Sequence, residues 1–273
     1  MTRFRTAAIA ASAVAAGAAI AFASPAHASV NAGTVYTSNE AGWQAHGNGW
    51  NFRYLQDDVT LPDVTSSTFQ GSFAGYGASL RLANGSQIVD VGISTATSGG
   101  PYNAAFAVEY PDHSLGCSNT ASPAIPAGDT VRMTLFYDYT GSGNIRYSVS
   151  DTTQAGHNFS GTCHDPDQFF GAAQVVAGFS ADDWTPATVH PVSGNHRLIQ
   201  FRDTVVTSRT GIRSSIGTGS GHWPTQKIAL TSDGTPTGTL LASVPYAWGK
   251  FAVSPDNVIR DGRNITVWMP KAP

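Results

Sequence analysis

Apolar and polar residues alternate along much of the chain with the two-residue period of a β-strand. The alternation is clearest at 144–150 (Asn-Ile-Arg-Tyr-Ser-Val-Ser) and is followed approximately at 130–137. Residues 138–143 (Asp-Tyr-Thr-Gly-Ser-Gly) separate these two segments and have turn composition, so the whole stretch predicts a β-hairpin. The same pattern predicts further strands at 51–55, 59–61, 87–93, 104–110, 172–179, 197–206, 226–230 and 264–269.

The remainder of the chain supports an all-β fold. Beyond residue 28 no apolar stripe with the 3.6-residue period of a helix is sustained, and the chain contains 29 glycines and 15 prolines. Segment 208–224 is rich in Gly, Ser and Thr, but predicted strands flank it, so we expect a loop and not a linker. A β-sandwich or barrel built as one domain is therefore predicted.

The N-terminus has the organisation of a secretory signal peptide. Arg3 and Arg5 precede a short apolar stretch at 7–22, and Ala26-His27-Ala28 provides the small-residue pattern of a cleavage site. We predict a signal peptide at 1–28 and a secreted, extracellular domain at 29–273 that has no membrane segment after cleavage. An uncleaved anchor is the alternative. The alanine-rich leader resembles those of bacteria.

Charge and cysteine content narrow the class of partner. Without Arg3 and Arg5 the chain has 13 basic and 18 acidic residues, a net charge of 13 − 18 = −5, and it contains no Lys/Arg run. A nucleic-acid partner is therefore not expected.

Cys117 and Cys163 are the only cysteines. In an oxidising exterior they predict a disulfide that stabilises the fold by about 3–4 kcal/mol, with two free thiols as the alternative.

Carboxylates and aromatic rings supply the candidate chemistry. Glu40 and Glu109 are the only glutamates. Glu109 lies in an apolar run, so we expect it to be buried and hydrogen-bonded, whereas Glu40 lies in a polar segment and is expected to be solvated. Four aromatic residues are candidates for stacking on a sugar or lining a groove, although core packing is favoured for most of them: Trp43, Trp50, Tyr54 and Trp184. No cofactor motif or metal-ligand spacing occurs, so no cofactor and no metal are predicted.

An ordered set of motifs resembles the glutamic endopeptidases, the eqolisins. Residues 103–112 (Asn-Ala-Ala-Phe-Ala-Val-Glu-Tyr-Pro-Asp) resemble that family's "Y-x-x-W-Y-E-x-x-P" strand. Residues 125–131 resemble "I-x-x-G-D", and residues 147–153 resemble "I-x-D-x-T". Residues 86–93 lie where the family has "I-L-Q-x-G-V". The resemblance implies a concanavalin A-like jelly-roll sandwich of two antiparallel sheets.

The resemblance does not extend to the catalytic dyad of the family, which is a Gln and a Glu. Asp90 stands at the position of the Gln. The position of the Glu falls on Ala173 or, with a shift of one residue, on Gln174. Either the dyad is lost, or Asp90 supplies the acid and Gln174 the amide, with Glu109 in support. We favour loss because Asp is one methylene shorter than Glu and catalytic geometry is sensitive to shifts of about 1 Å.

Three functions therefore remain open from the sequence. The first is a secreted monomeric protein that binds an extracellular polymer, either a peptide or a glycan, on a concave sheet face. The second is an acid endopeptidase that uses Asp90 and Gln174. The third is a glycan-cleaving enzyme, which would need paired carboxylates, and Asp90 and Glu109 are the candidates on predicted strands. Whether the protein is an enzyme is left open.

Overall fold

A computed structural model describes residues 34–37, 40–45, 51–61, 73–82, 87–96, 100–110, 114–165, 175–183, 198–216, 223–231, 234–237, 240–242 and 265–268. These residues form strands and turns, and none of them belongs to an apolar helix long enough to cross a membrane. The strands are β1 (Thr34–Thr37), β2 (Glu40–Ala45), β3 (Phe52–Thr60), β4 (Phe73–Leu82), β5 (Ile88–Ala96), β6 (Tyr102–Glu109), β7 (Leu115–Ile125), β8 (Thr130–Tyr137), β9 (Asn144–Asp151), β10 (Asn158–His164), β11 (Val175–Asp183), β12 (Leu198–Ser208), β13 (Arg213–Ser215), β14 (Thr225–Thr231), β15 (Leu240–Ala242) and β16 (Ile265–Trp268).

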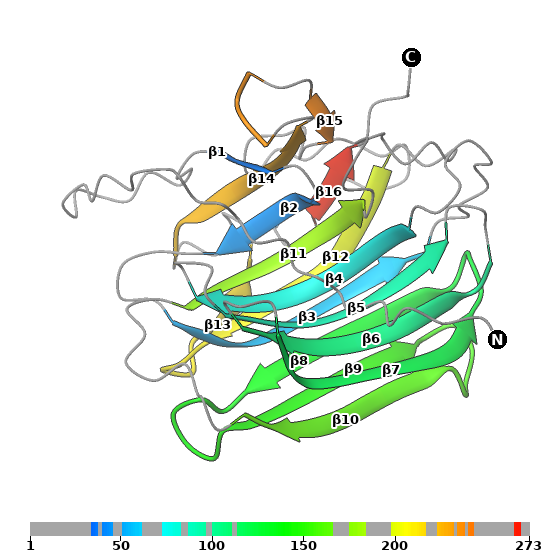
Figure 1. The fold of residues 1–273 in the computed structure, drawn as a ribbon, viewed down its shortest axis with the longest axis horizontal. Helices are drawn as coiled ribbons and strands as arrows, with labels where there is room; N and C mark the ends of the chain where they lie inside the picture. Colours follow the sequence, from blue (N-terminus) through cyan, green and yellow to red (C-terminus); the bar gives the residue numbers. More distant parts are fainter. Residues whose placement is uncertain are drawn as a thin grey trace.

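The strands form two sheets packed face to face (Figure 1). The nine-stranded sheet has the order β1-β14-β2-β11-β4-β5-β6-β7, with β15 paired to β14. The seven-stranded sheet has the order β10-β9-β8-β3-β12-β13, with β16 paired to β12. The described pairs are antiparallel except for β1 and β14, which run parallel. The predicted all-β sandwich of two antiparallel sheets is thus confirmed.

Strand prediction succeeded for strands with one buried and one polar face, such as β8 and β9, and for the apolar run of β6, which is buried on both faces. The predicted hairpin is formed by β8 and β9, which pair from Val131–Asp151 to Tyr137–Ile145. The predicted strands at 51–55 and 59–61 are instead one strand, β3. Seven of the described strands were not predicted: β1, β2, β4, β7, β10, β13 and β15. Among them, β7 and β10 are edge strands with largely exposed side chains, and glycines weaken the pattern of β4. Pairing on both sides with β11 and β5 holds β4 in the sheet.

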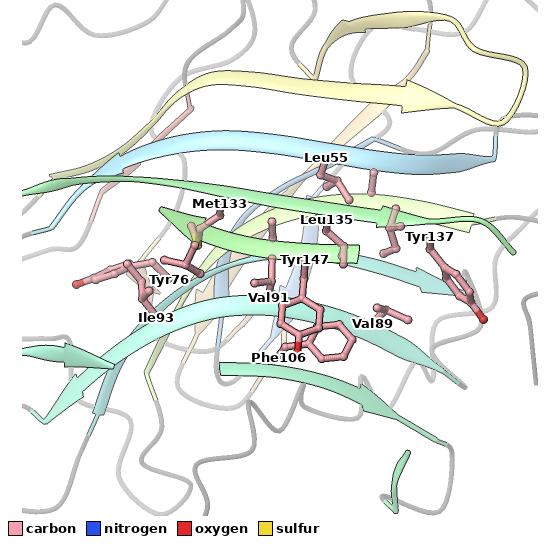
Figure 2. Packing of buried hydrophobic residues seen from close by; sticks show 14 of the residues in the cluster. Leu55, Tyr76, Val89, Val91, Ile93, Phe106, Met133, Leu135, Tyr137 and Tyr147 are labelled. Carbon is pink, nitrogen blue, oxygen red and sulfur yellow. The ribbon is translucent and has the colours of Figure 1, made fainter. Parts of the chain in front are cut away.

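The core lies between the sheets and is filled by alternate residues of the central strands. Figure 2 shows side chains of both sheets meeting there, among them Leu55, Val91 and Leu135. Phe106 of β6 stacks on Tyr147 of β9 with ring centroids 3.9 Å apart and planes 6° from parallel. Because the two rings come from different sheets, this contact fixes how the sheets are placed relative to each other.

One carboxyl group, Asp57, is buried among these core residues. It lies between Leu55 and Val59 on β3, with the same facing, and it is 0% exposed. Neither carboxyl oxygen has a hydrogen-bond partner among the described residues. Burial, and to a smaller extent the charge of Asp58, raises the pKa of Asp57 well above its ordinary value. The two acidic residues Asp57 and Asp58 interrupt the apolar pattern of β3, and for this reason the sequence predicted two separate strands there.

The predicted disulfide is present between Cys117 on β7 and Cys163 on β10, with Cα atoms 6.1 Å apart. These two strands are the last members of their sheets on the same side of the sandwich. The disulfide therefore links the two sheets covalently at this edge. The proposed signal peptide, residues 1–28, lies outside the described residues, so the boundary at residue 28 stays a prediction.

Candidate functional site

The candidate site is the outer face of the nine-stranded sheet, the face turned away from the core. Strand alternation creates it: Val89 and Val91 belong to the core, so Asp90 between them points outward. In the same way Ser79 and Arg81 of β4 alternate with Ala78 and Leu80. This face is nevertheless shielded from solvent, since Asp90 is 3% exposed and Arg81 is 8% exposed.

Asp90 and Glu109 lie on adjacent strands and on the same face. Asp90 pairs with Ala107 across β5 and β6, while Glu109 pairs with Ile88, two positions along. Asp90 and Glu109 are therefore diagonal neighbours, a relation that places Cα atoms about 7–8 Å apart. Glu109 is buried at 5% exposure, as its apolar sequence context predicted. The sequence alone could not show that these two carboxylates share a face.

Glu40 and Arg81 form a buried ion pair beside Asp90. The Arg81 guanidinium donates to both oxygens of Glu40, at 2.8 and 3.2 Å, and to the Ser79 hydroxyl at 2.9 Å. Glu40 is 8% exposed, so the expectation that it is solvated was wrong. Its local sequence is polar, but the tertiary fold places β2 near β4, where the arginine compensates the buried charge. Arg81 and Ser79 carried no motif that marked them in advance.

A row of residues with little or no side chain crosses the centre of this face. Through the pairing register, Gly42 of β2, Gly77 of β4, Gly92 of β5 and Ala105 of β6 lie in one line across the sheet, with Ser180 of β11 between Gly42 and Gly77. We call these four residues the small-residue row. At about 4.8 Å per strand it extends across about 19 Å of sheet.

A polar row runs parallel to the small-residue row. It contains Gln44, Ser79 and Asp90, which the pairing register aligns through Gly178 of β11. Gln44 donates its amide to Gln226 of β14 at 2.7 Å. The outer face thus carries a strip of small residues, of which Gly42, Gly92 and Ala105 are buried, bordered on one side by amide, hydroxyl and carboxylate groups.

The remaining predicted site residues are scattered. Gln174, Trp50 and Trp184 lie outside the described residues, so the Asp90/Gln174 dyad stays a prediction. Trp43 is 3% exposed and belongs to the core between the sheets, so its role is packing and it does not line either outer face. Tyr54 lies on the outer face of the seven-stranded sheet and lines a groove there.

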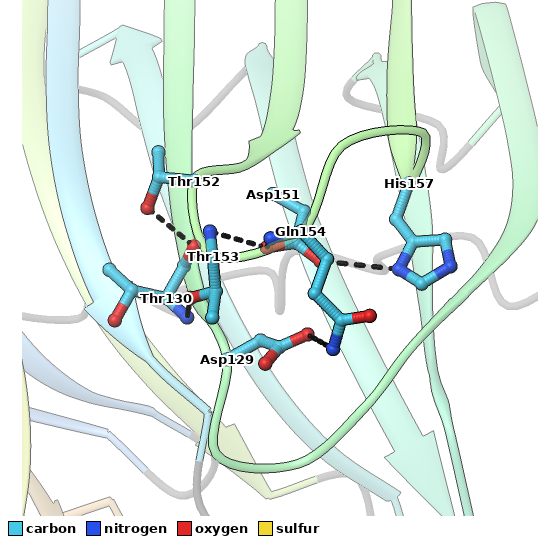
Figure 3. Close-up of polar contacts among 7 residues, drawn as sticks. All are labelled: Asp129, Thr130, Asp151, Thr152, Thr153, Gln154 and His157. Atoms are coloured by element: carbon cyan, nitrogen blue, oxygen red, sulfur yellow. Dashed lines mark hydrogen bonds and ion pairs between the residues drawn. The ribbon is translucent and has the colours of Figure 1, made fainter.

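A second acidic cluster joins Asp129, from the turn between β7 and β8, to Asp151 and His157 at the turn between β9 and β10. Its ligand atoms are within 4.8 Å of one another, a geometry that could hold a metal ion. Figure 3 shows that hydrogen bonds of the turn use these groups: Asp151 accepts from the amides of Thr153 and Gln154 and contacts His157 at 3.2 Å. Burial raises the pKa of Asp151, but these hydrogen bonds outweigh burial and lower it overall. We assign the cluster to holding the turn.

Asp165 is a further buried carboxylate, although residues 164–167 have the composition of a solvated turn. It follows β10, is 1% exposed, and accepts hydrogen bonds from Gln87 at 2.9 Å, Tyr110 at 3.1 Å and Tyr137. These donors come from both sheets. Asp165 therefore ties the sheets together close to the disulfide, and its neighbour Cys163 is only two residues away.

Comparison with known proteins identifies the class of fold. No family model and no curated protein matches the chain. The fold is that of the eqolisin glutamic peptidases. Scytalido-glutamic peptidase, solved with a peptide-based transition-state analogue, superposes with a TM-score of 0.57 and 15% identity, covering 86% of this chain and 100% of that chain. SCP-B of the eqolisin family, solved with the tripeptide Ala-Ile-His, gives a TM-score of 0.52 at 14% identity with the same coverage. At such identities the likeness establishes the fold and not the activity.

Proposed function

We propose that this protein is a secreted, monomeric binding protein that holds an extended stretch of extracellular polymer on the outer face of the nine-stranded sheet. The observation that carries the proposal is the small-residue row with its polar border. Glycine and alanine put little side chain between the backbone of the sheet and a ligand, and the polar row of Gln44, Ser79 and Asp90 borders this strip.

Peptide is the favoured ligand class, with glycan as the alternative. A row of about 19 Å accommodates roughly six residues of an extended peptide at about 3.3 Å per residue. The solved relatives support this choice, because one was determined with a peptide-based analogue and another with a tripeptide. Binding without cleavage is favoured because Asp90 occupies the position of the family's catalytic glutamine and no glutamate stands at the position of the second dyad member.

A substitution that fills the row tests the proposal directly. The purified mature protein is titrated with a fluorescent peptide library of six to eight residues, and binding is followed by anisotropy. Ala105→Phe places a ring across the row and should weaken binding at least tenfold, about 1.4 kcal/mol. Ser122→Phe adds the same ring at an exposed position of β7 and should leave binding unchanged. Thermal unfolding verifies that both variants are folded. Equal affinities for the two variants would refute binding on this face.

A second candidate function, hydrolysis at acidic pH, is favoured by the placement of Asp90 and Glu109 on one face. As an endopeptidase, the protein would use Asp90 as general base toward a water molecule, with the Gln174 amide and Glu109 in support. As a glycan-cleaving enzyme, it would use Asp90 and Glu109 as the paired carboxylates.

Cleavage assays separate these activities from binding. Unfolded protein and polysaccharide substrates are incubated with the protein from pH 2 to pH 7. An endopeptidase or glycosidase of this kind should lose its activity in Asp90→Asn, and the glycosidase should also lose it in Glu109→Gln. Cleavage that survives Asp90→Asn contradicts both catalytic schemes, and no cleavage at any pH leaves binding as the function of this face.

A further inference from the structure

The outer face of the seven-stranded sheet carries a separate groove of about 530 Å³. Its lining includes two aromatic rings, one arginine and several hydroxyl groups from β3, β8, β9 and β10: Tyr54, Phe136, Arg146, Thr134, Ser148 and Thr162. The groove lies on the opposite side of the sandwich from Asp90 and the small-residue row. It is therefore independent of the function proposed above.

Arginines gather around the aromatic rings of this groove. The guanidinium carbons of Arg146 and Arg53 lie 5.1 and 5.9 Å from the centre of the Phe136 ring. That of Arg213 lies 5.8 Å from the centre of the Tyr54 ring. These cation–π contacts hold the guanidinium groups over the groove while leaving their N–H donors available to a ligand.

The acidic groups close to the groove are already engaged by protein donors. Asp58 accepts two hydrogen bonds from Arg132, both at 2.7 Å. Asp138 accepts from the amide and the hydroxyl of Ser142, both at 2.9 Å. Asp138 keeps its negative charge and interacts with Arg53 and Arg146. Together with Arg213 these groups sum to 3 − 1 = +2 at the groove, on a chain whose net charge is −3. The groove is therefore positively charged although the chain as a whole is negative, and a positive groove favours an anionic ligand.

We propose that the groove binds an anionic polysaccharide rich in uronic acids. The apolar face of a sugar ring packs on Tyr54 and Phe136, as sugars commonly do on exposed aromatic rings. The planar fork of Arg146 binds the carboxylate through two parallel hydrogen bonds. The exposed hydroxyl of Thr162 is placed to bond to sugar hydroxyls, and Thr134 and Ser148, whose hydroxyls bond to each other at 2.7 Å, keep acceptor capacity. An acidic peptide would satisfy the arginines but would not use the aromatic and hydroxyl surface.

Three matched polymers test this assignment on the full-length mature protein. The probe is polygalacturonate, its fully methyl-esterified form keeps the sugars and removes the charge, and polyglutamate keeps the charge and removes the sugars. We expect binding to polygalacturonate, with affinity at least tenfold weaker for each of the other two. No binding to polygalacturonate, or equal binding of either control polymer, overturns the proposal.

Two variants locate the binding to the groove. Arg146→Gln and Phe136→Leu should each weaken the binding of polygalacturonate at least tenfold. Arg209→Gln removes the same charge from an exposed turn outside the groove lining and should change affinity less than twofold. Equal losses in Arg146→Gln and Arg209→Gln would indicate non-specific attraction and overturn the assignment. Ala105→Phe on the other sheet should leave this binding intact, so failure of one binding face is distinguishable from failure of the other.

Discussion

Asp57→Asn should make the protein more stable at neutral pH and less sensitive to pH. Asp57 is 0% exposed within the core, its oxygens have no hydrogen-bond partner among the described residues, and its pKa is raised by burial and by Asp58. Asparagine has nearly the same shape and cannot ionise. The substitution therefore removes the cost of a buried carboxylate while leaving the packing around β3 nearly unchanged.

The direction and slope of the effect follow from proton linkage. In the unfolded chain Asp57 loses its proton near pH 3.9, whereas the folded state retains the proton to higher pH because its pKa is raised. Between the two pKa values the folded state binds one more proton than the unfolded state. The free energy of unfolding should therefore fall by about 1.4 kcal/mol per pH unit as pH rises through this window, and this contribution should be level outside it.

Urea denaturation from pH 3 to pH 8 measures the free energy of unfolding of the wild type and of Asp57→Asn. The two proteins should be almost equally stable near pH 3, and the difference should grow in favour of the variant as pH rises. Asp58→Asn is the comparison variant. It breaks the partly exposed pair with Arg132 and should lower stability at neutral pH by up to about 1 kcal/mol, while the carboxyl group of Asp57, and with it the pH dependence, is retained. A pH-independent difference between the wild type and Asp57→Asn would refute the reasoning.

Three further sets of substitutions should lower the free energy of unfolding by amounts that the structure predicts. Replacing both cysteines of the Cys117–Cys163 disulfide by serine should cost about 4 kcal/mol for a loop of 46 residues, measured by urea denaturation, with the reduced wild type falling to the same stability. Arg81→Met leaves Glu40 buried without its cation and should lower the free energy of unfolding by about 3–5 kcal/mol. The double variant Arg81→Met/Glu40→Leu should recover most of this stability, because it removes the buried charge as well. A double variant as unstable as Arg81→Met would contradict a charge origin. Gly161→Ala puts a methyl group 2.6 Å from Cζ of Tyr147 and should cost about 1–3 kcal/mol, while Ser160→Ala on the exposed face of β10 should cost little.

Much of the sheet structure could be predicted from alternation, because a strand with one buried face records its environment in its own sequence. This holds for β8 and β9, and the order of motifs led to the correct class of fold. It fails for β7, an edge strand whose side chains are largely exposed, and for β4, whose glycines contribute little to any pattern. The stability of these two strands comes from pairing with neighbours that are distant in sequence.

The candidate site, like the strands, could be predicted from the sequence only in part. The sequence identified Asp90 and Glu109 as carboxylates in strands, and alternation gave each strand two faces. It could not give the register between β5 and β6, so it left open whether the two carboxylates face one side. Glu40 was assigned to solvent because its segment is polar, yet Arg81 reaches it from β4, 41 residues away along the chain.

The sequence by itself determined the all-β class and the disulfide pair, since each depends on residue identity or on a local period. Tertiary structure alone decided which polar groups meet. It joined Glu40 to Arg81, aligned four small residues into a row across five strands, and placed arginines over the rings of Tyr54 and Phe136. The physical reason is that strand pairing and sheet packing bring together residues from distant parts of the chain, and no local pattern records which residues those are.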